Sequence, residues 1–219
     1  MRTYRMVSEK GEDAVRKKTQ SKREEIVAIA RAAFLDGGYS ATSMATIAAL
    51  VGGSKGTLYG YFSSKEELFG AVVRDVSEEH GLPVLALLDD PRADLAETIF
   101  ALARALTRFF VMPEAIAHYR LAVGESGRFP KLGQIFFEQG QKEGEDMVTA
   151  WLEERIARGE LAARPPRLLA QQFVALCRAG PWNALLMGAP EQPGEAQLEE
   201  LATLAAQTFL AAHARPHPE

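Results

Sequence analysis

The chain has 219 residues, of which 47% are hydrophobic and 25% charged, so it can bury a sizeable core. It contains no apolar run of the roughly 18 residues that a membrane span requires, and its N-terminal stretch lacks the apolar segment of a signal peptide. One cysteine, Cys177, excludes internal disulfides and Cys-x-x-Cys metal clusters. We therefore expect a cytoplasmic protein without a cofactor, a metal site or a membrane partner.

The net charge of −4 is unevenly distributed along the chain. Residues 1–62 contain ten Lys or Arg against six Asp or Glu, whereas the remaining residues contain fifteen against twenty-three. A basic N-terminal part on an acidic body indicates that the N-terminal part meets a polyanion.

In chain order, residues 1–19 are polar and without periodicity, which predicts a flexible arm. Helical spacing begins after Ser21, and the glycine pair at 37–38 ends this first helix. Its apolar face consists of Ile26, Ile29, Ala30, Ala33 and Phe34.

Three short helices follow in the sequence. Thr42 or Ser43 can cap the first of them, and the glycine pair 52–53 separates it from a helix that Ser54 can cap. A Ser-x-x-Glu capping box then opens a helix over about residues 65–80.

The rest of the chain keeps a helical period, without alternating strand-like runs, tandem repeats or low-complexity tracts. Proline and glycine clusters divide it into five helices, about 91–111, 114–125, 129–158, 166–187 and 195–212. The sequence therefore predicts an all-α protein.

The segment 43–62 is the most informative part of the sequence. Two helices too short to be stable alone, joined by a glycine turn, must pack on each other and on a third helix. This is the arrangement of a helix-turn-helix, whose second helix enters the major groove of DNA. The outward positions carry small polar, cationic and aromatic residues: Ser54, Lys55, Gly56, Thr57, Tyr59 and Gly60.

These residue types suit DNA. Hydroxyls can donate to phosphates or base edges, and Lys55 can bind a phosphate or a guanine edge. Thr42 lies at a helix N-terminus, where backbone amides favour an anion, and Lys65 is placed similarly. The alternative is a three-helix packing element with glycines in its loops.

Residues 21–73 resemble the DNA-binding domain of TetR-family transcriptional regulators. The resemblance rests on Phe34, Gly38-Tyr39, Thr42-Ser43, Ile47-Ala48, Ser54-Lys55-Gly56-Thr57-Leu58-Tyr59, Tyr61-Phe62 and Ser64-Lys65-Glu66. It implies a nine-helix fold in which a three-helix DNA-binding domain (20–66) precedes an effector-binding and dimerisation domain (67–213). We expect the terminal residues 214–219 to form a disordered tail. The expected DNA-binding residues are Thr42, Ser43, Ser54, Lys55, Gly56, Thr57, Tyr59, Tyr61 and Lys65.

The chain departs from the family pattern at two glycines. Gly53 stands where the family usually has an apolar residue, and Gly60 replaces a larger polar residue between the two tyrosines. Since a glycine inside a helix costs roughly 0.5–1 kcal/mol relative to alanine, we expect a recognition helix that is mobile in the absence of DNA.

Residues 110–188 resemble the C-terminal domain of AefR-like members of the family, which adds no defined ligand chemistry. Aromatic residues crowd into this part of the chain and can line an effector pocket, although such clusters usually form core. The candidate pocket residues are Phe100, Phe110, His118, Tyr119, Phe136, Phe137, Trp151, Phe173, Cys177 and Trp182.

The last two predicted helices carry apolar stripes that can pair with a second copy as a four-helix interface. The alternative is that both stripes face their own core. The candidate dimer residues are Phe173, Val174, Leu198, Leu201, Ala202, Ala205 and Phe209.

No hydrolase, metalloprotease, P-loop or dinucleotide-binding motif occurs, so we expect no enzyme. The resemblance to the TetR family implies a homodimer that binds a palindromic DNA operator, and we expect a repressor that leaves this operator when a small apolar or amphipathic effector binds. The alternative function is a ligand-independent or activating regulator of the same fold that responds to a protein partner.

Overall fold

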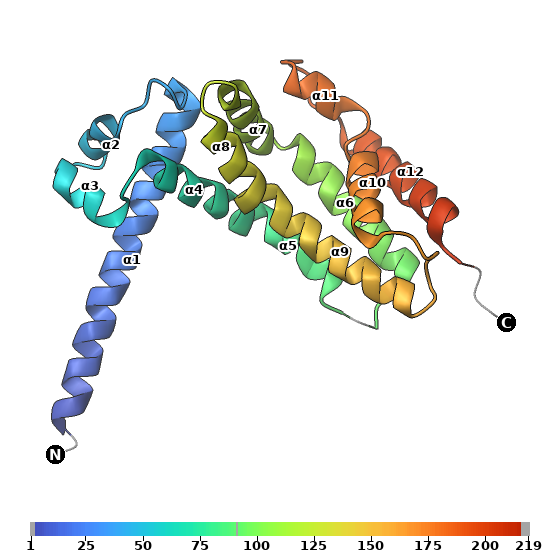
Figure 1. The fold of residues 1–219 in the computed structure, drawn as a ribbon, viewed down its shortest axis with the longest axis horizontal. Helices are drawn as coiled ribbons and strands as arrows, with labels where there is room; N and C mark the ends of the chain where they lie inside the picture. Colours follow the sequence, from blue (N-terminus) through green and yellow to red (C-terminus); the bar gives the residue numbers. More distant parts are fainter. Residues whose placement is uncertain (1–2, 91, 216–219) are drawn as a thin grey trace. The chain divides into compact units, whose positions relative to one another are not determined.

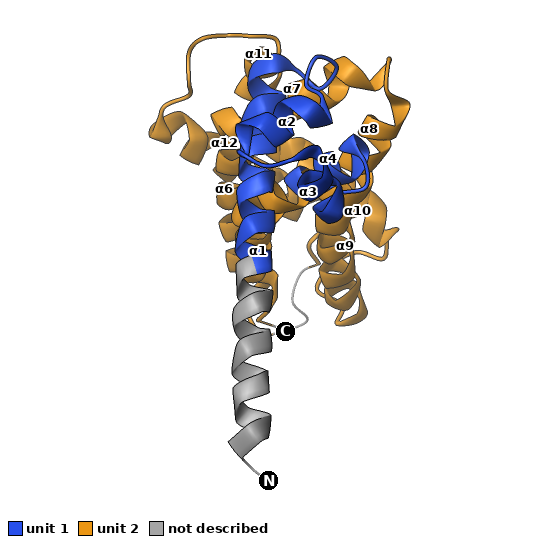
Figure 2. Ribbon diagram, turned by 90° about the vertical axis from the view of Figure 1, so that its left-hand side faces the viewer, with its two compact units in different colours: residues 1–72 blue, residues 73–219 orange. Residues whose placement is uncertain are grey.

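The computed structural model describes the backbone of residues 3–90 and 92–215, and the side chains of residues 19–90 and 92–215 (Figure 1). Within these residues every regular element is helical, which confirms the all-α prediction. An isolated antiparallel bridge joins Leu161 to Ala214. The chain divides into two compact units, residues 1–72 and residues 73–219 (Figure 2), whereas the division predicted from the sequence lies at 66/67.

The first unit consists of α1 (Thr3–Gly37), α2 (Met44–Leu50), α3 (Lys55–Tyr61) and the beginning of α4 (Lys65–Val76). Helix α1 begins well before Ser21, where helical periodicity starts in the sequence. The added residues contain no proline and are rich in Lys, Arg and Glu, which are good helix formers. The predicted flexible arm, 1–19, falls almost wholly on residues whose side chains lie outside the described part.

A cluster of three aromatic rings forms the centre of the first unit. The ring centroids of Phe34 and Tyr39 lie 5.4 Å apart, and those of Tyr39 and Phe69 lie 5.5 Å apart in an edge-to-face arrangement. Ile47 and Leu58 add the inner faces of α2 and α3 to the core of this unit. Because α2 and α3 have seven residues each, this burial supplies stability that the helices lack alone.

Capping residues and one glycine set the ends of α2 and α3. The backbone N–H of Thr57 donates to Ser54 Oγ (3.0 Å), as the sequence predicts, and that of Thr46 donates to Ser43 Oγ (3.1 Å), so Ser43 rather than Thr42 caps α2. Gly52, between the helices, has φ +69°, a left-handed conformation that glycine adopts without steric cost.

In its described residues, 73–90 and 92–215, the second unit contains the rest of α4 and eight further α-helices. They are α5 (Leu82–Leu85), α6 (Leu95–Val111), α7 (Pro113–Ser126), α8 (Pro130–Phe136), α9 (Lys142–Ala157), α10 (Pro166–Cys177), α11 (Pro181–Leu186) and α12 (Glu195–His213). One π-helical turn, Ser77–Gly81, links α4 to α5, and another, Phe137–Gln141, links α8 to α9. A short 3-10 segment, Ala86–Leu88, follows α5.

The core of the second unit lies where α6, α10 and α12 pack together, with α9 against α10 (Figure 1). Leu102, Ala170 and Phe173 are completely buried there, and the rings of Phe173 and Phe209 meet edge to face at 5.1 Å. No helix in the described residues is long and apolar enough to cross a membrane.

The predicted helix over 166–187 is broken into α10 and α11. Gly180 has φ +85°, and Pro181, which lacks an N–H, begins the next helix. The single helix predicted over 166–187 is therefore wrong, since the structure has two helices there.

Part of the predicted disordered tail, 214–219, is held by backbone hydrogen bonds. The N–H of Arg215 donates to the carbonyl of Glu160 (2.9 Å), and the N–H of Ala214 donates to the carbonyl of Leu210 (2.8 Å). Residues 216–219 lie outside the described part.

We predict opposite effects for two glycine substitutions in the first unit. Gly52→Ala should destabilise the turn by about 1–2 kcal/mol, because alanine is strained at positive φ. Gly60→Ala should stabilise α3 by about 0.5–1 kcal/mol, since a Cβ there meets no atom within 4 Å. Hydrogen exchange of the α3 amides measures both changes, and shifts of the same sign would contradict this account of the turn.

Candidate DNA-binding face and effector cavity

Helix α3 separates its residues sharply into a buried and an exposed set. Leu58 is 2% exposed, whereas Tyr59 on the neighbouring position is 50% exposed. Tyr61 is half-buried. The residues predicted to face outward are all exposed: Ser54, Lys55, Gly56, Thr57, Tyr59 and Gly60. The α2–α3 pair thus presents one polar, hydroxyl-rich face with a single lysine.

The hydroxyls at the starts of α2 and α3 are arranged by capping. Ser54 Oγ lies 3.0 Å from Thr57 Oγ1, and Ser43 Oγ lies 2.9 Å from Thr46 Oγ1. These pairs are exposed, so their remaining hydrogen-bonding capacity faces outward.

Thr42 is placed differently from the other expected DNA-binding residues. Its side chain is buried, and its hydroxyl lies 2.8 Å from the Gly38 carbonyl and 3.0 Å from the Ala33 carbonyl, to which it can donate. The side chain closes the end of α1, and this position does not favour a contact with DNA.

Lys65 is also directed inward, toward the loop between α1 and α2. Its Nζ donates to the carbonyls of Tyr39 (2.7 Å) and Thr42 (3.0 Å) and lies 4.0 Å from the centroid of the Tyr39 ring. Two carbonyls and a ring face account for its position at the start of α4. The Lys65 ammonium thus binds within the unit, and the phosphate contact expected from the sequence stays a prediction.

The second unit contains a cavity of about 600 Å³, a volume that suits a drug-sized ligand. Residues from α4 to α11 line it, and most of them are apolar. Five of the predicted pocket residues lie in its wall: Phe110, His118, Tyr119, Phe136 and Trp182.

The other five predicted pocket residues lie elsewhere. Trp151, Phe173 and Cys177 are buried in the helical core, Phe100 packs against that core, and Phe137 is half exposed. Burial raises the pKa of the Cys177 thiol to about 12, which keeps this group protonated and unreactive at neutral pH.

The sequence analysis missed much of the cavity wall. Aliphatic residues of α4, α5 and α6 (Val73, Val76, Leu85 and Leu106) lie in it, together with Val174 and Arg178. Periodicity indicates that such residues are inward-facing, but it does not show which of them border a space. Arg178 directly follows the apolar run 173–177, and a cation at that place could have been noticed in the sequence.

Arg178 lies among the aromatic side chains of the wall. Its guanidinium carbon is 4.4 Å from the centroid of the Phe110 ring, 5.3 Å from that of Trp182 and 5.9 Å from that of Tyr119. Burial lowers the pKa of Arg178 from its usual value. Arginine nevertheless stays charged at neutral pH, so the wall carries a cation.

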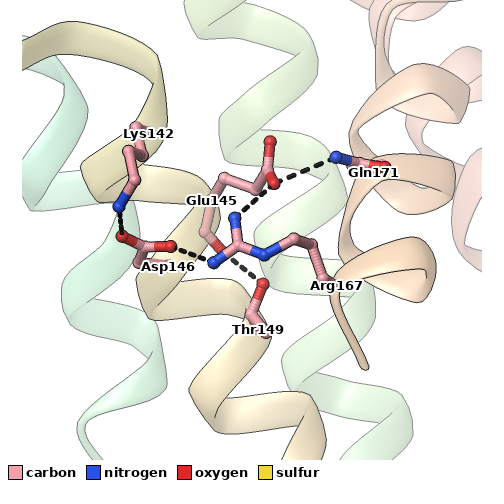
Figure 3. A network of polar contacts seen from close by, with 6 residues as sticks. All are labelled: Lys142, Glu145, Asp146, Thr149, Arg167 and Gln171. Carbon is pink, nitrogen blue, oxygen red and sulfur yellow. Dashed lines mark hydrogen bonds and ion pairs between the residues drawn. The ribbon is translucent and has the colours of Figure 1, made fainter. Parts of the chain in front are cut away.

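A polar network at the rim of the cavity joins α9 to α10 (Figure 3). Arg167 donates to Glu145 (2.7 Å) and to Asp146, while Gln171 also donates to Glu145 (3.0 Å). Hydrogen bonds from Lys142 and Arg167 lower the pKa of Asp146. Glu145 is the only carboxylate among the described wall residues, and this network holds it in an ion pair with Arg167.

The predicted dimer stripe faces the core of its own chain. Five of its residues are buried there, because α12 packs against α6 and α10: Phe173, Leu198, Ala202, Ala205 and Phe209. Val174 borders the cavity, and Leu201 lies against Gly180. On the outer faces of these helices, Leu168 of α10 is 49% exposed and Leu204 of α12 is 52% exposed.

A helix-turn-helix with an exposed second helix defines the class of DNA-binding regulators, and the second unit of the same chain contains a ligand-sized cavity. The profile described as bacterial regulatory proteins of the tetR family matches residues 26–72. The profile of the C-terminal domain of AefR-like transcriptional repressors matches residues 97–215, more than half of the chain. The chain belongs to the TetR family of transcriptional regulators, with an AefR-like C-terminal domain.

Individual relatives agree with this assignment. The transcriptional repressor KstR2 of Mycolicibacterium smegmatis is 32% identical over 145 residues, which cover 64% of this chain and 67% of KstR2. A TetR-family regulator from Mesorhizobium loti is 27% identical with a TM-score of 0.79, covering 90% of this chain and 98% of its own. The flavonoid-responsive regulator FrrA is 31% identical with a TM-score of 0.75, covering 91% and 100% respectively.

We predict that substitutions of two lysines of the first unit differ in their effect on its stability. Lys65→Met should destabilise the first unit by about 1–3 kcal/mol, because two carbonyl groups lose a charged donor. The matched variant Lys55→Met should leave stability within about 0.5 kcal/mol, since Lys55 is exposed. Hydrogen exchange of α1 and α4 amides measures the difference, and equal stability of both variants would show that the Lys65 contacts contribute nothing.

Proposed function

We propose that this protein is a homodimeric repressor that binds an inverted-repeat DNA operator through α3 and leaves it when a small apolar or amphipathic molecule enters the cavity. The observation that carries the proposal is the polar exposed face of α3 in one unit together with the cavity in the other. The description of the matching C-terminal profile and the name of KstR2 both support repression.

The exposed residues of α3 supply the chemistry for DNA. Lys55 can bind a phosphate or a guanine edge, and the Ser54 and Thr57 hydroxyls can donate to phosphates or bases. Tyr59 projects a ring and a hydroxyl from the same face. We assign no phosphate contact to Thr42 and Lys65, because their polar atoms bind carbonyl groups within the unit.

Two-fold operators require two recognition helices about one DNA turn, roughly 34 Å, apart. A homodimer provides them, and its interface needs apolar surface that the single chain leaves exposed. Leu168 and Leu204 provide such surface on α10 and α12, which pack against each other within the second unit. We therefore assign the dimer interface to the outer faces of these two helices.

The cavity supports a small-molecule effector. Its apolar wall suits an apolar ligand body, and FrrA, a relative of similar fold, is named for its response to flavonoids. No feature of the described residues similarly favours control by a protein partner.

Helix α4 offers a route from the cavity to the DNA-binding unit. Its residues Leu68 and Phe69 are buried in the first unit, whereas Val73 and Val76 line the cavity in the second. A ligand that pushes on Val73 or Val76 therefore acts on a helix that also belongs to the first unit. To release DNA, the ligand must bind the DNA-incompetent state more tightly than the competent one.

Selection of bound fragments from genomic DNA tests the operator. The wild-type protein should enrich inverted repeats with half-sites about 34 Å apart. Enrichment without two-fold symmetry, or no enrichment over scrambled DNA at low ionic strength, would contradict the proposal.

We predict that Leu204→Glu yields a monomer and lowers operator affinity at least tenfold, because a charge at the interface must be desolvated. Val123→Glu on α7 is the matched control, since Val123 is 56% exposed and lies outside the assigned interface. Sedimentation velocity and fluorescence anisotropy with the selected operator measure mass and affinity. A dimeric Leu204→Glu variant would place the interface elsewhere.

A further inference from the structure

Arg178 is a cation without an anionic partner in the wall of the cavity. Among the described residues it forms no ion pair, and its Nε is completely buried without a hydrogen-bond acceptor. Other cations near the cavity are engaged: Arg167 with Glu145, and Arg120 with the backbone carbonyls of Leu185 and Leu186.

The aromatic side chains around Arg178 stabilise the charge of its guanidinium group but not its N–H donors. The faces of Phe110, Tyr119 and Trp182 attract the positive charge, but they do not accept hydrogen bonds from the N–H groups in the guanidinium plane. A buried donor without an acceptor costs free energy that a ligand with an acceptor recovers. The aromatic surroundings therefore hold the cation in place and leave its hydrogen bonds to be completed.

The other ionisable groups of the wall do not neutralise this cation. Glu145 is paired with Arg167 and also accepts from Gln171. His118 Nδ1 lies 2.8 Å from the carbonyl oxygen of Glu114. The cavity thus combines a mostly apolar wall with one uncompensated positive charge.

We propose that the effector is a hydrophobic carboxylic acid whose carboxylate binds Arg178 while its apolar body fills the rest of the cavity. This inference deepens the proposed function, on which it rests. A planar guanidinium matches the two oxygens of a carboxylate in a bidentate pair. Val73, Leu85, Leu106 and Val148 offer aliphatic surface for the ligand body.

Isothermal titration of the full-length protein with decanoate and with decanamide tests the carboxylate. The two probes have the same length and shape but differ in charge. Decanoate should bind at least tenfold more tightly, as expected for a charged hydrogen bond in a partly buried site.

Substitutions assign the preference to Arg178. Arg178→Gln should reduce the decanoate preference to less than threefold, and Arg178→Lys, which keeps the charge but loses the bidentate geometry, should give an intermediate value. The matched control is Arg104→Gln on α6, where Arg104 is exposed and paired with Glu199. This control should keep the wild-type preference. Circular dichroism verifies that each variant is folded.

Three outcomes would overturn the inference: no decanoate binding, equal binding of both probes, or a preference that survives Arg178→Gln. If both probes bind equally, the cavity still accepts an apolar effector and the proposed function stands. The titration uses no DNA, so a protein that prefers decanoate but enriches no operator would refute the proposed repressor function and leave the Arg178 assignment intact.

Discussion

The structure depends on one constraint: helix α4 contributes side chains to two separate environments. Its first half places Leu68 and Phe69 in the aromatic core of the DNA-binding unit, and its second half places Val73 and Val76 in the wall of the cavity. An α-helix of 12 residues such as α4 is stiff, because its backbone hydrogen bonds link successive turns. The proposed response to a ligand needs no other connection between the two sites.

The DNA-binding unit and the cavity use opposite means to present a ligand-binding surface. Helix α3 is too short to be stable alone and depends on the burial of Leu58. Most of its other side chains are exposed. The cavity instead offers a mostly apolar wall, in which the few polar groups would select the proposed effector. Arg178 is such a group, since it is positioned by rings and lacks an acid of its own.

The sequence predicts local features well and long-range ones poorly. Capping by Ser43 and Ser54 depends on neighbouring residues, and both caps are confirmed. The inward direction of Lys65 depends on a carbonyl 26 positions away, which no periodicity encodes. An apolar stripe likewise does not specify whether its own chain or a second copy covers it. The sequence therefore places Phe173 and Phe209 in a dimer interface, whereas the structure buries both in the core of their own chain.

The most direct test of coupling through α4 is the reciprocity of ligand and operator binding. Decanoate affinity is measured for the free protein and for its complex with the selected operator, and operator affinity is measured with and without decanoate. The account predicts that each ligand weakens the other by the same factor, on the order of 5–150-fold. Binding of decanoate that is equally tight in the free and the operator-bound protein would contradict it.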